Sequence, residues 1–488
     1  MIRQTLASAI VVTYNSRRHI SACLTSLARS TIRPDEIIVV DNNSTDGTAD
    51  FVRSTFPDVT LLDYWDNRGF AEGNNRALRI ASGRFCFLLN PDAAVAPDCL
   101  QQLLAAMEKD PRIGVAVPKV LLAREPSVIN SAGLNVNRIG YGWDRGFLEW
   151  DCGQYDTEAP VVAGSGCAML LRRSMLKEIG TFDSTYFLYY EDVDLCLRAW
   201  LAGFRVQYVP KAVAWHDMKV SGRSLYYNEC LDHRHRLRTM LKNLPAATLL
   251  SVGPRMLAFE LKSVMAAVRD RRWKSLRLRL KAWAWNGRHL VSSIRLRARI
   301  QRSRTVDGRV LSDLFTEGWG APSARAALPD YAEAYEDSLD PSRAAPEVRL
   351  GVDDPGRLGL GWYGSEAMDG LQCRWCCGYG ILFLKRPGPR SEATLRVLCR
   401  SPRETLVTAI LNGNPQGQWL ISPGGWREYA LDVKANSEVV RLALVPEPTF
   451  VPAEAFPASP DRRVLGVAVS RVALESSCAV AGTEQATR

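Results

Sequence analysis

Residues 1–215 alternate short β-rich runs with segments of helical periodicity, and this alternation constrains the fold more than any other feature of the sequence. The β-rich runs lie at residues 9–13, 36–40, 59–62, 85–89 and 114–117. Helical patterns cover residues 19–30, begin near residue 45, and cover residues 71–81 and 98–109. Strands that alternate with helices predict an α/β fold with a doubly wound, mostly parallel sheet. Such a sheet binds ligands at the carboxyl ends of its strands.

The remainder of the 488-residue chain changes character twice. A helical pattern with apolar stripes comes first, and short β-rich runs separated by Gly, Pro and Asn turns come later. These later runs predict an antiparallel β-sandwich of the jelly-roll kind. They lie at residues 371–374, 381–384, 393–399, 405–411, 426–431, 439–445 and 464–473. The predicted division is an α/β catalytic domain at 1–230, a basic amphipathic helical region at 231–315, a linker at 316–346, the β-sandwich at 347–480 and a tail at 481–488.

The net charge of +10 comes from one part of the chain. Residues 254–304 contain 15 Lys or Arg and two acids, a balance of +13, so the rest of the chain sums to −3. Trp273, Trp283 and Trp285 alternate with these cations at helical spacing, which favours binding to an anionic membrane surface. A solvated charged face is the alternative. Nucleic acid is not expected as a partner, because no binding motif supports it.

The sequence predicts neither export nor a membrane span. Residues 1–13 lack the cleavage site of a secretory signal, and charged residues interrupt the most apolar helical window, 244–268. Most of the 12 cysteines stand singly in apolar stretches, as reduced thiols do. We therefore expect a cytoplasmic protein that binds peripherally at the inner face of the cytoplasmic membrane.

Two acids follow apolar runs at the edge of the sheet where a ligand is expected. Asp41 precedes cap-forming residues, and its carboxylate can accept hydrogen bonds from a nucleobase or a ribose. Asp92 ends the segment Asn90-Pro91-Asp92 and can supply an oxygen ligand to Mg²⁺ or Mn²⁺. Both segments are also ordinary turn and cap sequences, so a purely structural role stays open for each.

Three further segments carry candidate chemistry. Residues 67–75 form a polar, glycine-containing start of a helix, where Arg68 can meet a phosphate. Glu191 and Asp192 open a helix after the aromatic run 186–190, and one carboxylate there can take a proton from a sugar hydroxyl. Acids also favour first helical turns for electrostatic reasons alone. His216 is a candidate ligand near a metal-bound diphosphate, although single histidines are more often structural.

Taken in this order, the motifs resemble those of inverting nucleotide-sugar glycosyltransferases of family 2, which have the GT-A fold, and of their rhamnosyltransferase-like branch in particular. The resemblance covers roughly residues 5–230. It implies that a nucleotide-sugar pocket is formed by Thr13, Asn15, Asp41, Asn67, Arg68, Asn74 and Asn90. It also implies that Asp92 and His216 contact the metal and that Asp192 is the catalytic base, with Glu191 as the runner-up. Asn90 departs from the family's Asp-x-Asp element, which has an acid at that position.

The resemblance implies a single displacement with inversion, in which Asp192 deprotonates an acceptor hydroxyl and Mg²⁺ or Mn²⁺ stabilises the leaving diphosphate. The resemblance suggests dTDP-rhamnose as the first donor to consider. The spacing of the motifs does not favour it over a UDP-sugar. The acceptor would be a saccharide or a lipid-linked saccharide in the synthesis of cell-surface polysaccharide or glycolipid. The β-sandwich resembles carbohydrate-binding-like domains attached to glycosyltransferases. The alternative function is a glycan-binding protein with a degenerate transferase domain.

Overall fold

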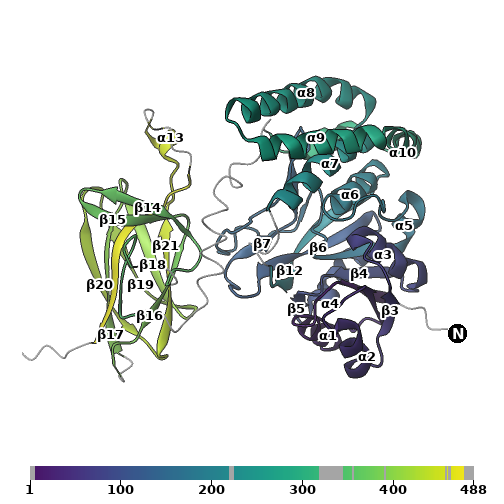
Figure 1. Cartoon of the computed structure of the whole chain (residues 1–488). Coiled ribbons are helices and arrows are strands. Elements are labelled where there is room, and N and C mark those ends of the chain that lie inside the picture. The colour runs from purple at the N-terminus through teal and green to yellow at the C-terminus, as the bar shows by residue number, and fades with distance from the viewer. Residues whose placement is uncertain are drawn as a thin grey trace, which may run out of the picture. The chain divides into compact units, whose positions relative to one another are not determined.

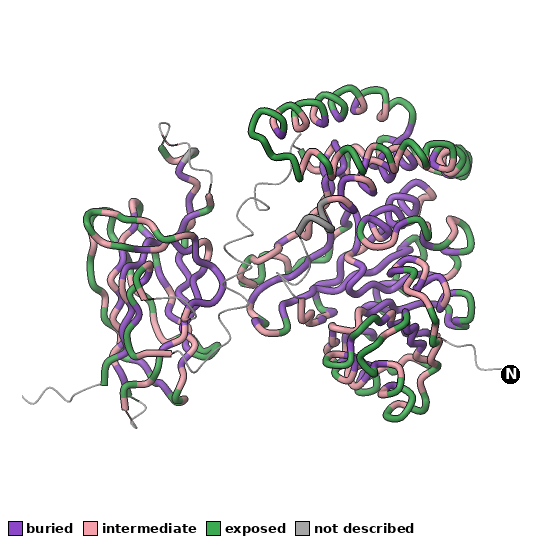
Figure 2. The backbone as a smooth tube through the Cα atoms, in the orientation of Figure 1, coloured by how far each residue is buried: buried purple, intermediate pink, exposed green. Residues whose placement is uncertain are grey.

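The computed structural model describes residues 6–218, 225–317, 344–353, 357–388, 392–456, 459 and 463–476. The chain forms two compact units, one of residues 1–218 and 223–322 and the other of residues 219–222 and 323–488. Figure 1 shows the helices and strands of both units, and each unit has its own hydrophobic core, whose buried residues are among those drawn in purple in Figure 2. The predicted linker at 316–346 and the predicted tail at 481–488 lie mostly outside the described residues.

The first unit is built on a mixed sheet whose strands run in the spatial order β10-β12-β6-β11-β4-β1-β2-β3. Along this path, β1, β2, β3 and β4 pair in parallel, as β6 and β12 do, while β11 is antiparallel to both of its neighbours. The strands are β1 (Ala7–Thr13), β2 (Glu36–Asn42), β3 (Thr60–Tyr64), β4 (Phe85–Leu89), β6 (Ile113–Leu122), β10 (Ala159–Pro160), β11 (Ala168–Arg172) and β12 (Arg205–His216). Two short strands, β5 (Ala93–Val95) and β7 (Ile129–Ser131), attach to β12 and β6, and β8 (Leu134–Val136) pairs separately with β9 (Gly142–Asp144).

Helices cover both faces of this sheet because neighbouring residues of each central strand point to opposite sides. In β1, Ile10 belongs to one core cluster, and Ala9 and Val11 belong to the other. One side is covered mainly by α1 (Ile20–Ala28) and α4 (Cys99–Lys109), and the other by α3 (Gly69–Ile80), α5 (Arg173–Ile179) and α6 (Glu191–Leu201). The short helix α2 (Thr48–Thr55) follows β2. The predicted α/β fold is confirmed, and the antiparallel insertion of β11 was not predicted.

The basic helices belong to the same compact unit as the sheet. They are α7 (Leu225–Asn243), α8 (Ala246–Arg269), α9 (Trp273–Arg288), α10 (Leu290–Arg302) and α11 (Arg309–Leu314). Helix α7 crosses the domain boundary that we predict at residue 230, and it packs against α6, α9 and α10. No helix within the described part of the chain is both long and apolar enough to cross a membrane.

The second unit is an antiparallel β-sandwich, as predicted. One sheet contains β13 (Glu347–Arg349), β14 (Trp362–Met368), β15 (Leu371–Cys376), β17 (Glu392–Arg400), β20 (Arg427–Lys434) and β22 (Ala468–Ser476). The other contains β16 (Gly380–Lys385), β18 (Thr405–Leu411), β19 (Asn414–Ile421) and β21 (Val439–Glu447), and a short helix, α13 (Pro452–Ala455), follows β21. Trp362 and Trp375 are buried in this unit, so they are not available as surface platforms for a sugar ring.

Candidate active site

The candidate residues gather at one edge of the sheet because of how its strands are ordered. Strands β1, β2, β4 and β12 all run in the same direction, so their carboxyl ends meet at that edge. Thr13 ends β1, Asn90 directly follows β4, and His216 ends β12. This is the position at which sheets of this kind bind ligands.

The first cluster joins the ends of β1 and β2. Thr13 lies beside Asp41 in the parallel register, and both side chains are buried. The backbone N–H and the hydroxyl of Ser44 donate hydrogen bonds to Asp41 at 2.8 and 2.6 Å. Burial raises the pKa of Asp41, although the hydrogen bonds from Ser44 oppose that shift. The Thr13 hydroxyl is buried without a hydrogen-bond partner, which leaves it available to a bound molecule.

Asn15 connects this cluster to the loop before α2 through two hydrogen bonds. Its backbone N–H donates to the Ser44 hydroxyl at 2.8 Å, and its side-chain carbonyl accepts from the backbone N–H of Thr45 at 2.8 Å. Asn15 has a φ of 53°, a left-handed conformation that asparagine tolerates better than most residues. The structure therefore brings Thr13, Asn15 and Asp41 together as the sequence predicts.

The residues at the start of α3 have local structural partners. The Asn67 side chain accepts from the backbone N–H of Gly69 at 2.9 Å, and the Asn74 side chain donates to the Phe70 carbonyl at 2.9 Å. Arg68 is exposed and ion-paired with Asp66. Local hydrogen bonds thus account for both asparagines, a turn before α3 for Asn67 and a bond to the carbonyl four residues earlier within α3 for Asn74. The exposed Arg68 can exchange its partner for a phosphate.

Gly69 connects this helix start to two other parts of the site. Its carbonyl accepts a hydrogen bond from the Asn42 side chain at 3.0 Å, which links α3 to the end of β2. It has a φ of +80°, and a Cβ atom there would lie 2.1 Å from the Phe187 carbonyl oxygen. Only glycine satisfies both constraints, so the aromatic run 186–190 can approach α3 closely.

Asp92 and His216 converge because β5 pairs antiparallel with the end of β12. The Asp92 Oδ1 and His216 Nε2 atoms are 3.3 Å apart. His216 Nδ1 lies 2.8 Å from the Asn130 side-chain oxygen, so Nδ1–H donates there and Nε2 faces Asp92. Burial disfavours the Asp92 carboxylate, but the neighbouring imidazole holds its pKa below the usual value.

This pair fits a divalent cation. Asp92 Oδ1 is buried, and apart from its long contact with His216 Nε2 it has no hydrogen-bond partner among the described residues, so it has room for a further ligand. Asn130 orients the imidazole from the far side, as partners of metal-bound histidines do. No group of three or more His, Cys, Asp or Glu side chains suited to a metal occurs among the residues that the structure describes. A cation at this position would therefore take most of its remaining ligands from a diphosphate and water, as Mg²⁺ commonly does.

A second layer around this pair was missed by the sequence analysis. The backbone N–H of Asp217 donates to the Asp92 carbonyl at 2.8 Å. The Asp217 carboxylate lies 3.2 Å from His19 Nδ1 and accepts from Arg124 Nε at 2.5 Å. These residues come from four separate segments, so no sequence spacing relates them.

Asp192 is the more accessible of the two candidate bases. It is the second residue of α6 and is half-buried, whereas Glu191 is only 3% exposed. The Asp192 carboxylate accepts from the backbone N–H of Gly166 at 2.9 Å and from that of Val193 at 2.7 Å. Burial raises the pKa of Glu191 well above its usual value, and the Asp192 charge adds to that effect. Burial also raises the pKa of Asp192, while the two N–H groups favour its ionised form.

Gly166 is a further residue beside Asp192 that the sequence analysis did not single out. It lies in the Gly164-Ser165-Gly166 turn before β11, and that pair of glycines was the available signal. A Cβ atom at Gly166 would lie 3.1 Å from the Phe70 ring and 3.6 Å from the Asp192 carboxylate. The next residue, Cys167, accepts a hydrogen bond from the backbone N–H of Asn90 at 2.8 Å. This turn therefore connects the segment around Asp192 with the segment that contains Asp92.

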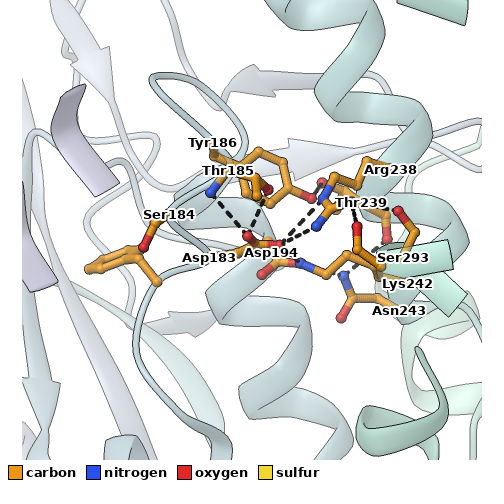
Figure 3. Close-up of polar contacts among 12 residues, drawn as sticks. Asp183, Ser184, Thr185, Tyr186, Asp194, Arg238, Thr239, Lys242, Asn243 and Ser293 are labelled. Atoms are coloured by element: carbon orange, nitrogen blue, oxygen red, sulfur yellow. Dashed lines mark hydrogen bonds and ion pairs between the residues drawn. The ribbon is translucent and has the colours of Figure 1, made fainter. Parts of the chain in front are cut away.

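A buried polar network fastens α6 to α7 (Figure 3). The Lys242 ammonium, 2% exposed, lies 2.6 Å from Asp183 and 2.9 Å from Asp194. Asp194 also pairs with Arg198 at 3.1 Å, and Asp183 with Arg238 at 3.0 Å. Although burial disfavours both carboxylates, Lys242 and the arginines hold the pKa values of Asp183 and Asp194 below their usual range. Buried ion pairs therefore hold the first turn of α6, which carries Asp192, against α7.

The chain reaches α6 through two strained residues. Tyr189 and Tyr190 have φ values of 68° and 70°, which are costly for residues other than glycine. His235 of α7 lies 3.0 Å from the Leu188 carbonyl and 2.9 Å from the Tyr189 carbonyl through Nδ1. Burial lowers the pKa of His235 to about 3, so the ring is neutral with Nδ1–H as the donor. Helix α7 therefore supports both the approach to α6 and its first turn.

Comparison with known proteins bears on this site. Residues 8–180 match the model of a protein family described as glycosyl transferase family 2. An N-acetylglucosaminyl-diphospho-decaprenol L-rhamnosyltransferase of Mycobacterium tuberculosis is 33% identical over 241 residues, in a match that covers 44% of this chain and 77% of that protein. A poly-beta-1,6-N-acetyl-D-glucosamine synthase of Staphylococcus aureus is 23% identical, over 42% of this chain and 48% of the synthase. A mannosyltransferase from Pyrobaculum calidifontis, solved in complex with GDP-Man and Mn²⁺, is 21% identical over 58% of this chain and 87% of its own, with a TM-score of 0.38.

Proposed function

The chain belongs to glycosyltransferase family 2, and from this premise we propose that it transfers a sugar, with inversion, from a nucleotide-sugar donor to a lipid-linked saccharide acceptor. The observation that carries the proposal is the convergence at one sheet edge of three groups with different chemistry. They are the Thr13–Asp41 cluster, the Asp92–His216 pair and the carboxylate of Asp192.

The first two groups suit the donor. Asp41 is held rigidly by Ser44, and its carboxylate can accept hydrogen bonds from the nucleoside beside the unsatisfied Thr13 hydroxyl. Arg68 offers an exposed guanidinium to a phosphate. Asp92 and His216 would hold Mg²⁺ or Mn²⁺, which when bound neutralises the charge of the diphosphate. Asn130 keeps the imidazole in the orientation that this role requires.

Asp192 suits the role of general base. The N–H groups of Gly166 and Val193 orient its carboxylate and favour its ionised form, while its partial exposure lets an acceptor hydroxyl reach it. A single displacement needs the base and the leaving diphosphate on opposite sides of the sugar. Glu191 is buried, and burial raises its pKa and so favours its neutral form, which makes it less suited to accept a proton from a substrate.

The substrate proposal draws on the relatives. The mycobacterial protein is named as an L-rhamnosyltransferase acting on N-acetylglucosaminyl-diphospho-decaprenol. We therefore propose dTDP-rhamnose as the first donor to test, with UDP-sugars as the competing class, and a polyprenyl-linked saccharide as the acceptor. Such an acceptor places the reaction at the inner face of the cytoplasmic membrane. The product would serve cell-surface polysaccharide or glycolipid synthesis.

A donor panel tests the function directly. Purified protein incubated with Mg²⁺ or Mn²⁺, a lipid-linked acceptor extract and individual dTDP-, UDP- and GDP-sugars should release free nucleoside diphosphate with one donor far faster than with the others. The physical reason is that a base contact and the sugar pocket each discriminate among donors. Release with none of the donors, together with tight glycan binding, would instead favour the glycan-binding alternative.

Removing the Asp92 carboxylate should weaken the metal-dependent part of donor binding. We expect Asp92→Ala to raise the donor dissociation constant measured with Mn²⁺ by a factor of about 10–100, because the cation loses a charged ligand. Binding measured by calorimetry without the metal should change little. The control is Asp58→Ala, which removes an exposed carboxylate before β3. Identical metal titrations for Asp92→Ala and the wild type would contradict the role of Asp92.

A further inference from the structure

We propose that the hairpin formed by α8 and α9 is the surface through which this protein binds an anionic lipid bilayer. The inference deepens the proposed function, on which it rests for the reason to approach a membrane. The surface itself is argued from the side chains of the two helices alone.

Helix α8 presents a continuous apolar stripe to solvent. Its members recur at helical spacing, so they share one side of the helix. They are Leu250, Leu257, Leu261, Met265 and Val268, and their exposed fractions run from 45% to 78%. The outer turns of α8 are exposed in Figure 2, whereas Val252, Met256 and Glu260 face inward. An exposed row of five large apolar side chains is unusual for a surface that meets only water.

Helix α9 combines apolar and cationic side chains. Trp273 is 60% exposed and Leu280 48% exposed. A shallow hollow on α9 is lined by Trp273, Leu276, Arg277, Leu280, Lys281 and Ala284. Tryptophan and leucine next to Lys and Arg are the composition of helices that lie in a membrane interface, where the ring and the aliphatic chains enter the lipid and the cations meet phosphate.

Both acids of this hairpin are ion-paired: Glu260 is buried, and Asp270 lies exposed between the two helices. Glu260 is 3% exposed and is bound by Arg236 of α7, by Arg279 at 3.1 Å and by the Trp283 indole N–H at 3.2 Å. Asp270 lies after the end of α8 and pairs with Arg269 and Arg272. Glu260 thus fastens the hairpin to the body of the unit, and the Lys and Arg side chains dominate the outer surface.

These features favour a bilayer over the other occupants. A nucleic acid would meet the cations but leave the apolar stripe of α8 in water, since phosphate contacts use charge alone. A second copy of the same surface would bring two strongly positive faces together. An anionic bilayer satisfies both components, because it accepts apolar side chains and attracts the cations.

The test is flotation of the full-length protein with vesicles, without donor or acceptor. We expect the wild type to float with vesicles of equal parts phosphatidylglycerol and phosphatidylcholine, and to float much less with phosphatidylcholine alone. One variant neutralises four exposed cations of the hairpin: Lys262→Gln, Arg277→Gln, Lys281→Gln and Arg288→Gln. At about fivefold per cation, its partition coefficient should fall on the order of several hundredfold.

A matched control removes the same charge elsewhere in the first unit through Arg33→Gln, Lys109→Gln, Lys177→Gln and Lys211→Gln, all of which are exposed. A third variant, Leu257→Ser with Leu261→Ser and Met265→Ser, keeps every charge and should lower partitioning by at least about tenfold. Far-UV circular dichroism checks that each variant remains folded.

Three results of the flotation experiments would overturn the proposal. They are failure of the wild type to float with anionic vesicles, equal losses in the hairpin variant and the control, and a change of oligomeric state in the hairpin variants with vesicle binding unaffected. Salt-sensitive binding to DNA or RNA without vesicle binding would likewise assign the surface to nucleic acid. Because no substrate is present, loss of flotation is distinguishable from failure of the transferase proposal, which the nucleoside diphosphate assay measures separately.

Discussion

Asp192→Asn should lower the rate of sugar transfer by a factor of about 10²–10⁴, the usual contribution of a general base. The asparagine keeps the size of the side chain and one of the two oxygens that accept from the Gly166 and Val193 N–H groups, but it cannot accept the proton. Donor binding should therefore remain close to that of the wild type. The measurement is the rate of nucleoside diphosphate release together with the donor dissociation constant from calorimetry.

Glu191→Gln is the matched control for this experiment. Glu191 is buried away from substrate, and burial raises its pKa and so favours the neutral form; a neutral amide of the same size should therefore cost much less activity than Asp192→Asn. The reverse order of losses would assign the base to Glu191. Wild-type turnover by Asp192→Asn would exclude Asp192 altogether.

The second large effect is on stability. Lys242→Met removes the only cation that contacts both Asp183 and Asp194 among the ion pairs of the described residues. Asp194 is fully buried and would keep Arg198 as an ion-pair partner, so the cost should approach but not exceed the roughly 3–5 kcal/mol typical of a buried charge left unpaired. We expect a loss of this order in the free energy of unfolding, measured by denaturant titration. Hydrogen exchange should show reduced protection of the first turn of α6.

Two variants show whether charge is the cause. Adding Asp194→Asn to Lys242→Met removes a carboxylate that has lost a partner, and it should recover part of the stability. Lys177→Met, at an exposed position of α5, should change the unfolding free energy by less than about 0.5 kcal/mol. An equal loss in Lys242→Met and Lys177→Met would show that the network contributes no more than a surface charge does.

Much of the local structure could be predicted because it depends on neighbours in the sequence. The run at 85–89 coincides with β4, and the helical pattern at 98–109 nearly matches α4, since apolar periodicity records which face each segment buries. Strands β14 and β19 were missed. In both strands the alternation of buried and exposed side chains is incomplete. Strand β19 also contains Pro415 and Gly417, two residue types that are unfavourable inside a strand.

The pairing of distant segments could not be predicted. Strand β11 lies antiparallel between β4 and β6, and its five residues are all buried, so no alternation of side chains marks its direction. The second layer around His216 and the Lys242 network likewise join segments far apart in the chain. Sequence spacing carries no information on such contacts.

The sequence by itself determined the chemical character of the site, namely which acids follow apolar strands and where the cations concentrate, because residue type and local order suffice for both. Only the tertiary structure decided that Asp92 meets His216, that Asp192 rather than Glu191 is accessible, and that Glu260 turns inward beneath the exposed apolar stripe of α8. The reason is physical. Burial and proximity depend on how strands and helices pack across the whole unit, and packing is a property of the assembled core rather than of any segment.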